Sequence, residues 1–234
     1  MPPYYNVIFQ FADVAKPHDF VAKLNVALVD GEFSYGGVPE GLWGVPHERA
    51  TLQELTEWNQ SLIDEDVHAG SVLKGRREYG QFYLRHPRYS HCRVILYNAH
   101  CMGVIVPERD IFEADFPVKI PFDAAHGKIG WSARAEQIDP LKRLAIAVWE
   151  TGLVQAVQTG TESTFWPGLD ELGAGYWPAV LPFAIVTRDD VDRFNLPPLT
   201  FRQIPIDERG VLLERFSLKR LTQYFRQGLQ GSTK

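Results

Sequence analysis

The chain has 234 residues, 45% hydrophobic and 23% charged, so it is long and apolar enough to bury a core of its own. Its 24 basic and 29 acidic residues give a net charge of −5, which argues against general attraction to nucleic acid or to an anionic membrane. Two cysteines are too few for a disulfide scaffold or a sulfur-rich metal site, and they predict a protein of the reducing cytoplasm.

The first quarter of the chain is predicted to hold a strand, a helix, a loop and a second helix. Apolar residues at every second position predict a strand with one buried face: Tyr5, Val7, Phe9 and Phe11. Residues 19–28 have apolar residues at helical spacing. Residues 32–46 are rich in glycine and proline and predict a loop that carries Trp43. A capping box of Thr51 and Glu54 then opens a helix that should end near Asp64.

The middle of the chain is predicted to be mainly strand. Runs rich in aromatic and β-branched residues span residues 79–84, 92–97 and 102–106, and residues 98–100 between the last two predict a hairpin turn. Residues 118–120, which have a proline on either side, predict an edge strand.

The second half is predicted to hold a long helix, a strand pair and a final helix. Asp139 as N-cap and Pro140 at the first helical position predict a helix with this packing stripe: Leu141, Leu144, Ala145, Val148 and Gly152. Residues 200–206 and 211–213 are expected to pair around a turn at 207–210, and Ser217 is expected to cap the last helix.

Because the strands are grouped and no repeat or low-complexity linker interrupts them, we expect a single α+β domain over residues 1–234. It should contain an antiparallel or mixed sheet with helices packed mainly on one face. A division into two smaller domains would fall near residues 125–138.

The distribution of apolar residues indicates neither secretion nor a membrane span. Residues 1–6 lack the basic start, apolar stretch and cleavage site of a secretory signal. The best apolar run, residues 179–186, contains Pro182 and is far shorter than the roughly 20 residues that cross a bilayer. We therefore expect a cytoplasmic protein.

Charge is distributed unevenly along the chain. Residues 30–66 contain nine acidic residues and one arginine, a net charge of −8, whereas residues 74–109 contain seven basic and two acidic residues, a net charge of +5. Such segments usually face solvent or pair with each other. The acidic segment is also a candidate surface for a basic partner.

The common catalytic and cofactor motifs are missing from the sequence. Gly127-Lys128 lacks the rest of a phosphate-binding loop, residues 173–176 lack the third glycine of a dinucleotide fingerprint, and no Gly-x-Ser-x-Gly occurs. The acidic clusters 64–66 and 189–192 are interpreted as solvated helix ends. We therefore expect no cofactor and no enzymatic activity.

Two His-Cys pairs, His91-Cys92 and His100-Cys101, are the strongest candidates for metal or nucleophile chemistry. Neighbours along a strand point to opposite faces, so at most one member of each pair can aim at a given point. Two ligands do not complete a structural zinc site. We interpret the pairs as small buried cysteines beside surface or hydrogen-bonded histidines, and we predict no metal.

Tryptophans crowd the second half of the chain, at positions 131, 149, 166 and 177. Most are expected in the core, because large aromatic residues dominate burial. Trp166-Pro167-Gly168 and Trp177-Pro178, however, are in sequences typical of loops, where an exposed tryptophan can anchor a partner.

Three segments near the C-terminus resemble a known bacterial family. They are residues 175–182 (Gly-Tyr-Trp-Pro-Ala-Val-Leu-Pro), the strand expected at 199–206, and residues 209–213 (Arg-Gly-Val-Leu-Leu), which lead into Ser217. This pattern resembles the C-terminal half of immunity proteins of bacterial polymorphic toxins. It is particularly similar to the family that neutralises restriction-endonuclease-like toxins, including effectors of type VI secretion.

The resemblance implies a toxin inhibitor of the toxin–antitoxin kind used in bacterial competition, which binds a cognate toxin, expected to be a nuclease, stoichiometrically. Nucleases bind nucleic acid through a basic surface, so an acidic face of the inhibitor could bind that same surface. Local acidity and loop aromatics select the residues expected to contact the toxin: Glu57, Asp64, Glu65, Asp66, Trp43 and Trp166.

Two other functions are compatible with the sequence. One is a cytoplasmic, hydrolase-like enzyme whose site is built from His100, Cys101 or dispersed carboxylates. The other is a module that binds a peptide along an exposed strand edge.

Overall fold

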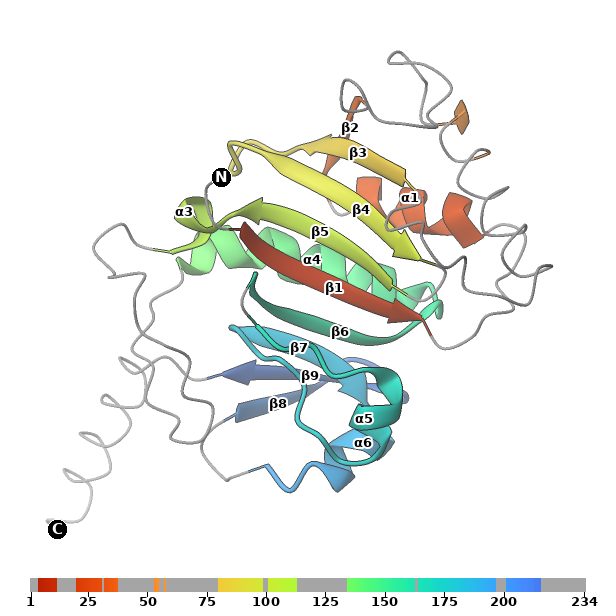
Figure 1. Ribbon diagram of the computed structural model, residues 1–234, viewed down its shortest axis with the longest axis vertical. Helices are drawn as coiled ribbons and strands as arrows, with labels where there is room; N and C mark the ends of the chain where they lie inside the picture. Colours follow the sequence, from red (N-terminus) through yellow and green to blue (C-terminus); the bar gives the residue numbers. More distant parts are fainter. Residues whose placement is uncertain are drawn as a thin grey trace, which may run out of the picture.

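The computed structural model describes residues 4–11, 20–30, 32–37, 53–54, 57, 80–98, 101–112, 134–162, 164–196 and 201–215. Within these residues, nine strands form one sheet in the order β2-β3-β4-β5-β1-β6-β7-β9-β8, and every neighbouring pair is antiparallel (Figure 1). The strands are β1 (Tyr4–Phe11), β2 (Ser34–Gly37), β3 (Gly80–Arg85), β4 (Cys92–Asn98), β5 (Cys101–Pro107), β6 (Val154–Thr161), β7 (Phe183–Thr187), β8 (Phe201–Pro205) and β9 (Gly210–Arg215). The helices are α1 (Phe20–Asp30), α3 (Glu108–Ile111), α4 (Ala135–Glu150), α5 (Leu169–Gly173) and α6 (Arg188–Arg193).

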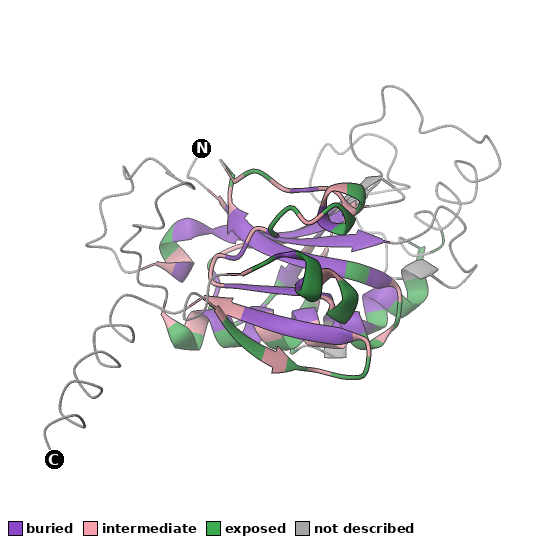
Figure 2. Cartoon of the chain, turned by 90° about the horizontal axis from the view of Figure 1, so that it is seen from below, coloured by how far each residue is buried: buried purple, intermediate pink, exposed green. Residues whose placement is uncertain are grey.

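β1 lies in the middle of the sheet, between β5 and β6. The predicted alternation is confirmed, because the odd-numbered residues of the strand all enter the larger core cluster: Tyr5, Val7, Phe9 and Phe11. Asn6, Ile8 and Gln10, which point to the opposite face, are buried as well. Most of the central strands are therefore buried on both faces (Figure 2).

The helices cover the two faces of the sheet at different places. α1 and α4 pack against the face that carries the larger core cluster, and α4 runs behind β1 and β5 (Figure 1). α5 and α6 pack on the other face, against Ala184 and Val186 of β7 and Val211 and Leu213 of β9. The prediction of a fold that mixes helices with an antiparallel sheet is confirmed. The prediction that the helices pack mainly on one face of the sheet is not confirmed. No helix in the described segments is both long and apolar enough to cross a membrane.

α4 begins five residues earlier than the sequence indicates. Arg134 is its N-cap, so Pro140 lies inside the helix rather than at its first position, and Asp139 is not the cap. The start is fixed by contacts that a capping pattern does not reveal, since Ile138 is buried and the Tyr89 hydroxyl donates a hydrogen bond to the Gln137 carbonyl.

The packing stripe of α4 is confirmed at four of the five predicted positions: Leu141, Leu144, Ala145 and Val148 are buried. The fifth, Gly152, lies beyond the end of the helix with φ +76°. Its role is to terminate the helix, because glycine adopts this left-handed conformation without a Cβ penalty.

Several other sequence predictions are settled by the strands. Those for residues 79–84, 92–97, 102–106, 200–206 and 211–213 are confirmed, and β4 and β5 pair as the predicted hairpin arms. The loop predicted at 32–46 is wrong at its start, where β2 pairs with β3 at the sheet edge. The predictions for the strand at 118–120, for the helix at Ser217 and for most of the helix after Thr51 lie outside the described residues, and the single-domain prediction is untested.

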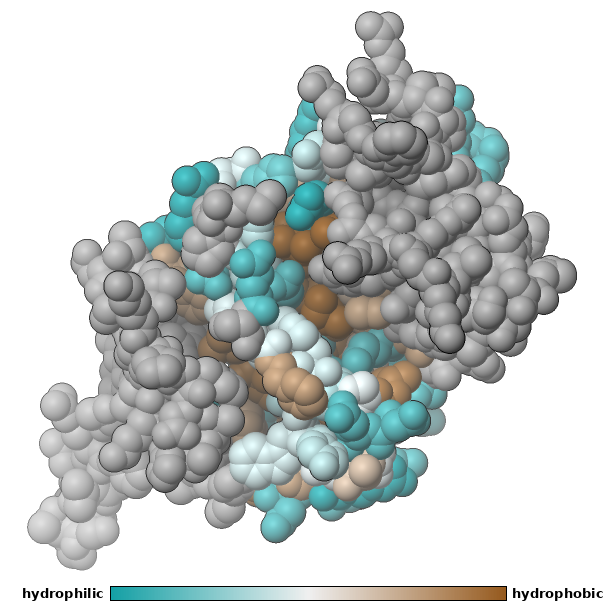
Figure 3. All heavy atoms as spheres, in the orientation of Figure 1, coloured by the Kyte–Doolittle hydropathy of each residue, from teal (hydrophilic) through white to brown (hydrophobic). Residues whose placement is uncertain are grey.

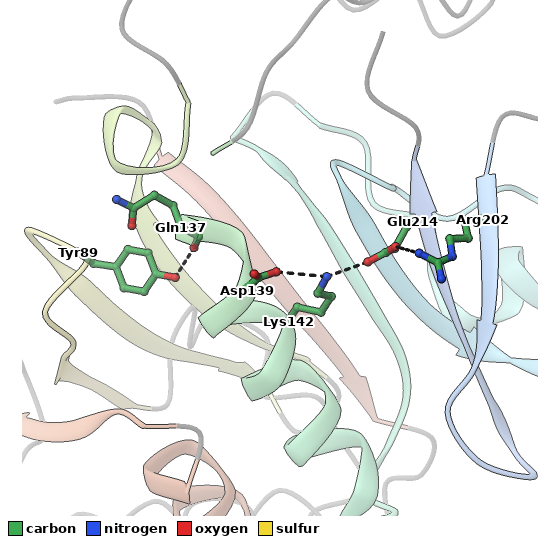
Figure 4. A network of polar contacts seen from close by, with 6 residues as sticks. All are labelled: Tyr89, Gln137, Asp139, Lys142, Arg202 and Glu214. Atoms are coloured by element: carbon green, nitrogen blue, oxygen red, sulfur yellow. Dashed lines mark hydrogen bonds and ion pairs between the residues drawn. The ribbon is translucent and has the colours of Figure 1, made fainter. Parts of the chain in front are cut away.

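A chain of charged side chains ties α4 to the last two strands (Figure 4). The Lys142 ammonium lies 2.8 Å from Glu214 of β9 and 3.4 Å from Asp139, and Arg202 of β8 lies 3.9 Å from the same Glu214. Lys142 and Glu214 are largely buried side chains, so this network fixes the β9-β8 end of the sheet against the helix.

Candidate functional site

Exposed aromatic residues gather on the two loops that flank α5. Four large hydrophobic residues in the described part of the chain are exposed, and three of them lie here: Phe165 (65% exposed), Tyr176 (58%) and Trp177 (44%). The fourth, Val26, lies on α1. Exposed aromatic residues are typical of contact sites for other proteins, because they supply large contact areas at low entropic cost.

The first loop, residues 164–168, is held to the sheet by buried amide side chains. The side-chain amides of Gln10 in β1 and Gln158 in β6 both donate to the Pro167 carbonyl at 2.8 Å. Gln158 also donates to the Gln10 side-chain carbonyl at 2.7 Å. Both glutamines are buried, so these bonds are shielded from water and fix the backbone next to Phe165 and Trp166.

Local contacts at the end of β6 shape the turn that leads into this loop. The Thr161 N–H donates to the Thr164 hydroxyl at 2.9 Å, and the Thr164 N–H donates to the Thr161 carbonyl at 3.0 Å. Gly160 permits this close approach, since a Cβ at this position would overlap the Thr164 side chain. At the far end, the Gly168 N–H donates to the Glu171 carboxylate at 2.8 Å and opens α5.

The second loop, residues 174–182, is fixed by the same glutamine. The Ala179 N–H donates to the Gln158 side-chain carbonyl at 2.8 Å, so one buried amide holds both aromatic loops. The Trp177 indole N–H donates to the Phe194 carbonyl, and its ring meets Phe201 edge-to-face at 6.1 Å. Trp177 is therefore both anchored and partly exposed, while the neighbouring Tyr176 extends into solvent.

A cavity of about 480 Å³ lies beside the first loop, on the face of the sheet opposite α4. Three isoleucines form its apolar base, one from each of β1, β5 and β4: Ile8, Ile105 and Ile95. Gly103 lies between Ile8 and Ile95 in the pairing register and has no side chain to fill the space between them. Figure 3 looks onto this face and shows hydrophobic residues lying among hydrophilic ones.

The rim of the cavity combines aromatic and charged side chains. Trp166 and Tyr4 line it, as do Glu162 and Arg93, whose guanidinium lies 6.0 Å from the centre of the Tyr4 ring. Glu108, at the start of α3, is close enough to Glu162 for their charges to repel. Burial, and then the charge of Glu162, raise the pKa of Glu108 to about 7, so this carboxyl is only partly ionised at neutral pH.

The two cysteines lie on opposite faces of the sheet. Cys92 is part of the core beneath α4, whereas Cys101 lines the cavity on the other face. Burial raises the pKa of each thiol to about 12, so both remain protonated and are poor nucleophiles at neutral pH. His91 packs edge-to-face on Tyr83, and His100 lies outside the described residues. The described part of the chain contains no group of three metal-ligating side chains.

A second cavity, of about 510 Å³, lies at the β3 edge near His86, Ser90 and His91. The hydroxyl of Ser90 donates to the Asp110 carboxylate at 2.7 Å, and its backbone N–H donates to the same oxygen at 2.8 Å. A serine bonded in this way fixes the β3–β4 turn against α3. It is not paired with a histidine base, as a hydrolytic nucleophile would be.

Two of the six predicted contact residues fall within the described segments. Trp166 lines the cavity beside the aromatic loop, and Glu57 is exposed and accepts a hydrogen bond from the Gln53 amide at 3.0 Å. Trp43, Asp64, Glu65 and Asp66 lie outside the described residues.

Sequence reasoning missed Phe165, Tyr176, Glu108 and Glu162, although the loop signals at Trp166-Pro167 and Trp177-Pro178 lay next to the first two.

Comparison with known proteins adds no assignment: no family model matches this chain, and no curated protein matches it significantly.

Proposed function

We propose that this protein is an immunity protein that binds a cognate toxin acting in the cytoplasm, expected to be a nuclease, and inhibits it by stoichiometric association. The observation that carries the proposal is the set of exposed aromatic residues fixed in place around α5: Phe165, Tyr176 and Trp177. Two of them belong to residues 175–182, the segment on which the resemblance to polymorphic-toxin immunity proteins rests.

The fixed geometry of these loops supports a binding role on energetic grounds. Association is weakened by the entropy lost when flexible side chains and loops become ordered. Here the buried amides of Gln10 and Gln158 have already fixed the loop backbone in the unbound protein. Aromatic side chains presented on a rigid base are the usual energetic centres of protein interfaces.

The acidic segment at residues 30–66 is proposed as the part of the surface that attracts a basic toxin over longer distances. Glu57, which is exposed, and Asp64, Glu65 and Asp66 are proposed as its main residues. Charge reversal at these four positions should slow association with the toxin. It should also reduce the dependence of the association rate on salt, because the attraction that salt screens would be gone.

The proposal expects a toxin to be encoded beside the gene, and co-expression with the product of that neighbouring gene tests it. The wild-type chain should abolish growth arrest and co-purify with the toxin. Phe165→Ala and Tyr176→Ala should each weaken the complex by about 1–3 kcal/mol, a typical loss at an aromatic anchor. Val26→Ala, which truncates the exposed hydrophobic residue on α1, is the matched control and should bind as wild type does.

The proposal fails if the wild-type chain neither protects cells nor co-purifies with the neighbouring gene's product. The assignment of the interface to the aromatic loops fails if the two aromatic variants bind as tightly as the Val26→Ala control.

A further inference from the structure

The cavity of about 510 Å³ at the β3 edge is lined by three basic side chains and one acidic side chain. The basic residues come from the two ends of one short turn: Arg85 ends β3, His86 follows it, and His91 precedes β4. A volume of this size is within the range of small-molecule sites. The balance of charge in the cavity therefore indicates what kind of ligand it suits.

The carboxylates beside this turn already have partners. Glu32, the acidic residue that lines the cavity, forms an ion pair with the Arg143 guanidinium. Asp110 of α3 accepts hydrogen bonds from the hydroxyl and the backbone N–H of Ser90, and it lies 3.9 Å from the Arg109 guanidinium. Both negative charges are therefore compensated by groups other than the basic side chains of the cavity.

The arginines of the turn, by contrast, have no acidic partner. Arg85 and Arg88 are exposed, and neither side chain forms an ion pair or a hydrogen bond with any residue of the described segments. The Arg85 guanidinium is thus available to an occupant of the cavity. A guanidinium presents its N–H donors as a fork that matches the oxygens of a phosphate or carboxylate group. The charge of the cavity therefore favours an oxyanion.

The two histidines add further N–H donors. His86 is buried against the rings of Phe33 and Tyr89, and its Nδ1 atom accepts a backbone N–H of the turn at 3.2 Å. Burial lowers the pKa of His86, so the neutral ring carries its proton on Nε2, which has no partner among the described residues. His91 packs edge-to-face on Tyr83 and makes no side-chain hydrogen bond within the same residues. An oxygen of a ligand would satisfy these donors.

We propose that this cavity binds the phosphate group of a small organic phosphate, which accepts hydrogen bonds from the Arg85 guanidinium and from the ring N–H groups of His86 and His91. A phosphate monoester suits this set better than a carboxylate, because it brings three acceptor oxygens to three donor side chains and carries about two negative charges at neutral pH. The organic part of the ligand would lie against Tyr83 and Pro87, which line the same cavity. The inference goes beyond the proposed function, because no toxin takes part in it.

Titration of the purified full-length protein with phenyl phosphate, followed by NMR of the backbone amides, tests the inference. The amides of residues 83–92 should shift saturably. Benzoate, which carries a carboxylate on the same ring, should bind at least about fivefold more weakly, and uncharged benzyl alcohol should cause no saturable shift. Equal affinities for phenyl phosphate and benzoate would overturn the assignment of phosphate, and the absence of saturable shifts with phenyl phosphate would overturn the site itself.

Two substitutions locate the binding. Arg85→Gln removes the charge of an exposed side chain and should weaken the binding of phenyl phosphate at least about tenfold. His91→Phe keeps a ring against Tyr83 but removes the N–H donor, and it should weaken binding at least about threefold. Arg202→Gln, which changes an exposed arginine at the opposite edge of the sheet, is the matched control and should stay within about twofold of wild type.

Urea denaturation of each variant establishes that it is folded before its affinity is compared. If folded Arg85→Gln and His91→Phe both bind phenyl phosphate as tightly as Arg202→Gln does, the cavity is not the site and the inference is overturned. The toxin is not used in these measurements, so that result would leave the proposed function unaffected.

Discussion

The side chain of Trp149 is held on all sides by packing, hydrogen bonds and a cation–π contact. Its side chain is fully buried at the end of α4, and its indole N–H donates to the Asp207 carboxylate at 3.0 Å. The Arg209 guanidinium lies 4.1 Å from the centre of the ring and donates to the Trp149 carbonyl at 2.7 Å. The β8–β9 turn is thus built around this one ring, which stabilises the turn by cation–π contact and by hydrogen bonds.

Gly210 is the residue that lets the turn approach Trp149, and this leads to a prediction. A Cβ at position 210 would lie 2.5 Å from the indole ring, which has no room to move. Gly210→Ala should therefore lower the free energy of unfolding by about 1–3 kcal/mol, the usual cost of overpacking a core. Urea denaturation followed by tryptophan fluorescence measures the change.

Gly173→Ala is the matched control for this substitution. Its Cβ would meet only the flexible end of Arg193, at 3.9 Å, so its stability should stay within about 0.5 kcal/mol of wild type. Equal stabilities of the two variants would contradict the packing account of Gly210.

At the scale of elements, Gln158 of β6 couples the aromatic loops to the sheet. Gln158→Leu conserves the approximate volume but leaves the Gln10 amide, the Pro167 carbonyl and the Ala179 N–H with fewer partners in a buried site. We expect a loss of at least about 2 kcal/mol in the free energy of unfolding. Hydrogen exchange of residues 164–168 and 176–181 should accelerate beyond what this loss alone produces, since both loops lose their anchor.

Gln155→Leu, on the same strand but exposed, is the control for this prediction. It should leave both stability and loop exchange close to wild type. Slow exchange of the two loops in Gln158→Leu would show that other contacts hold them.

The same strand explains which elements the sequence could predict. Strands 79–84, 92–97 and 102–106 were predictable because aromatic and β-branched residues dominate them. β6 was missed because its sequence, Val-Gln-Ala-Val-Gln-Thr-Gly-Thr, has polar residues at positions that prove to be buried. Gln158 and Thr159 are tolerated there only because partners far away in the sequence satisfy their hydrogen bonds, and a local pattern does not contain that information.

The limits of α4 and β2 have similar causes. The capping signal at Asp139 and Pro140 was locally valid, but tertiary contacts of Ile138 and Gln137 extend the helix by a further turn. β2 is short and contains glycines, and it exists as a strand because β3 offers it an edge to pair with.

At the scale of the whole molecule, the candidate site depends on long-range pairing. Trp166 could be selected from the sequence because Pro167 and Gly168 indicate a loop, where an exposed tryptophan can anchor a partner. The cavity base could not, since Ile8 and Ile105 meet only through the register of β1 with β5, almost a hundred residues apart. The encounter of Glu108 with Glu162 likewise needs the ends of β5 and β6 to flank β1.

The free energy of unfolding should depend on pH in a way that reflects the burial of Glu108 and its repulsion by Glu162. Burial and the charge of Glu162 raise the pKa of Glu108 to about 7, whereas a glutamate in the unfolded chain titrates near 4.3. Between these values the folded state binds more protons than the unfolded state, so the contribution of Glu108 to stability falls as the pH rises through this window. Below this pH window Glu108 is protonated in both the folded and the unfolded state, so it does not lower the stability. Above the window the full cost of ionising the buried carboxyl lowers the stability of the folded state.

Glu108→Gln removes the titrating group while keeping its shape. At pH 8 it should be more stable than wild type by roughly 1–2 kcal/mol, less than the full conversion of the pKa shift because solvent screens part of the interaction. Urea denaturation at pH 4, 5, 6, 7 and 8 gives both curves, and their difference isolates Glu108 from the histidines that titrate in the same range. This difference should vanish near pH 4 and grow towards pH 8, whereas Glu150→Gln should show no such growth. A constant difference at every pH would mean that Glu108 is ionised without cost in the folded protein, and that neither burial nor the charge of Glu162 raises its pKa.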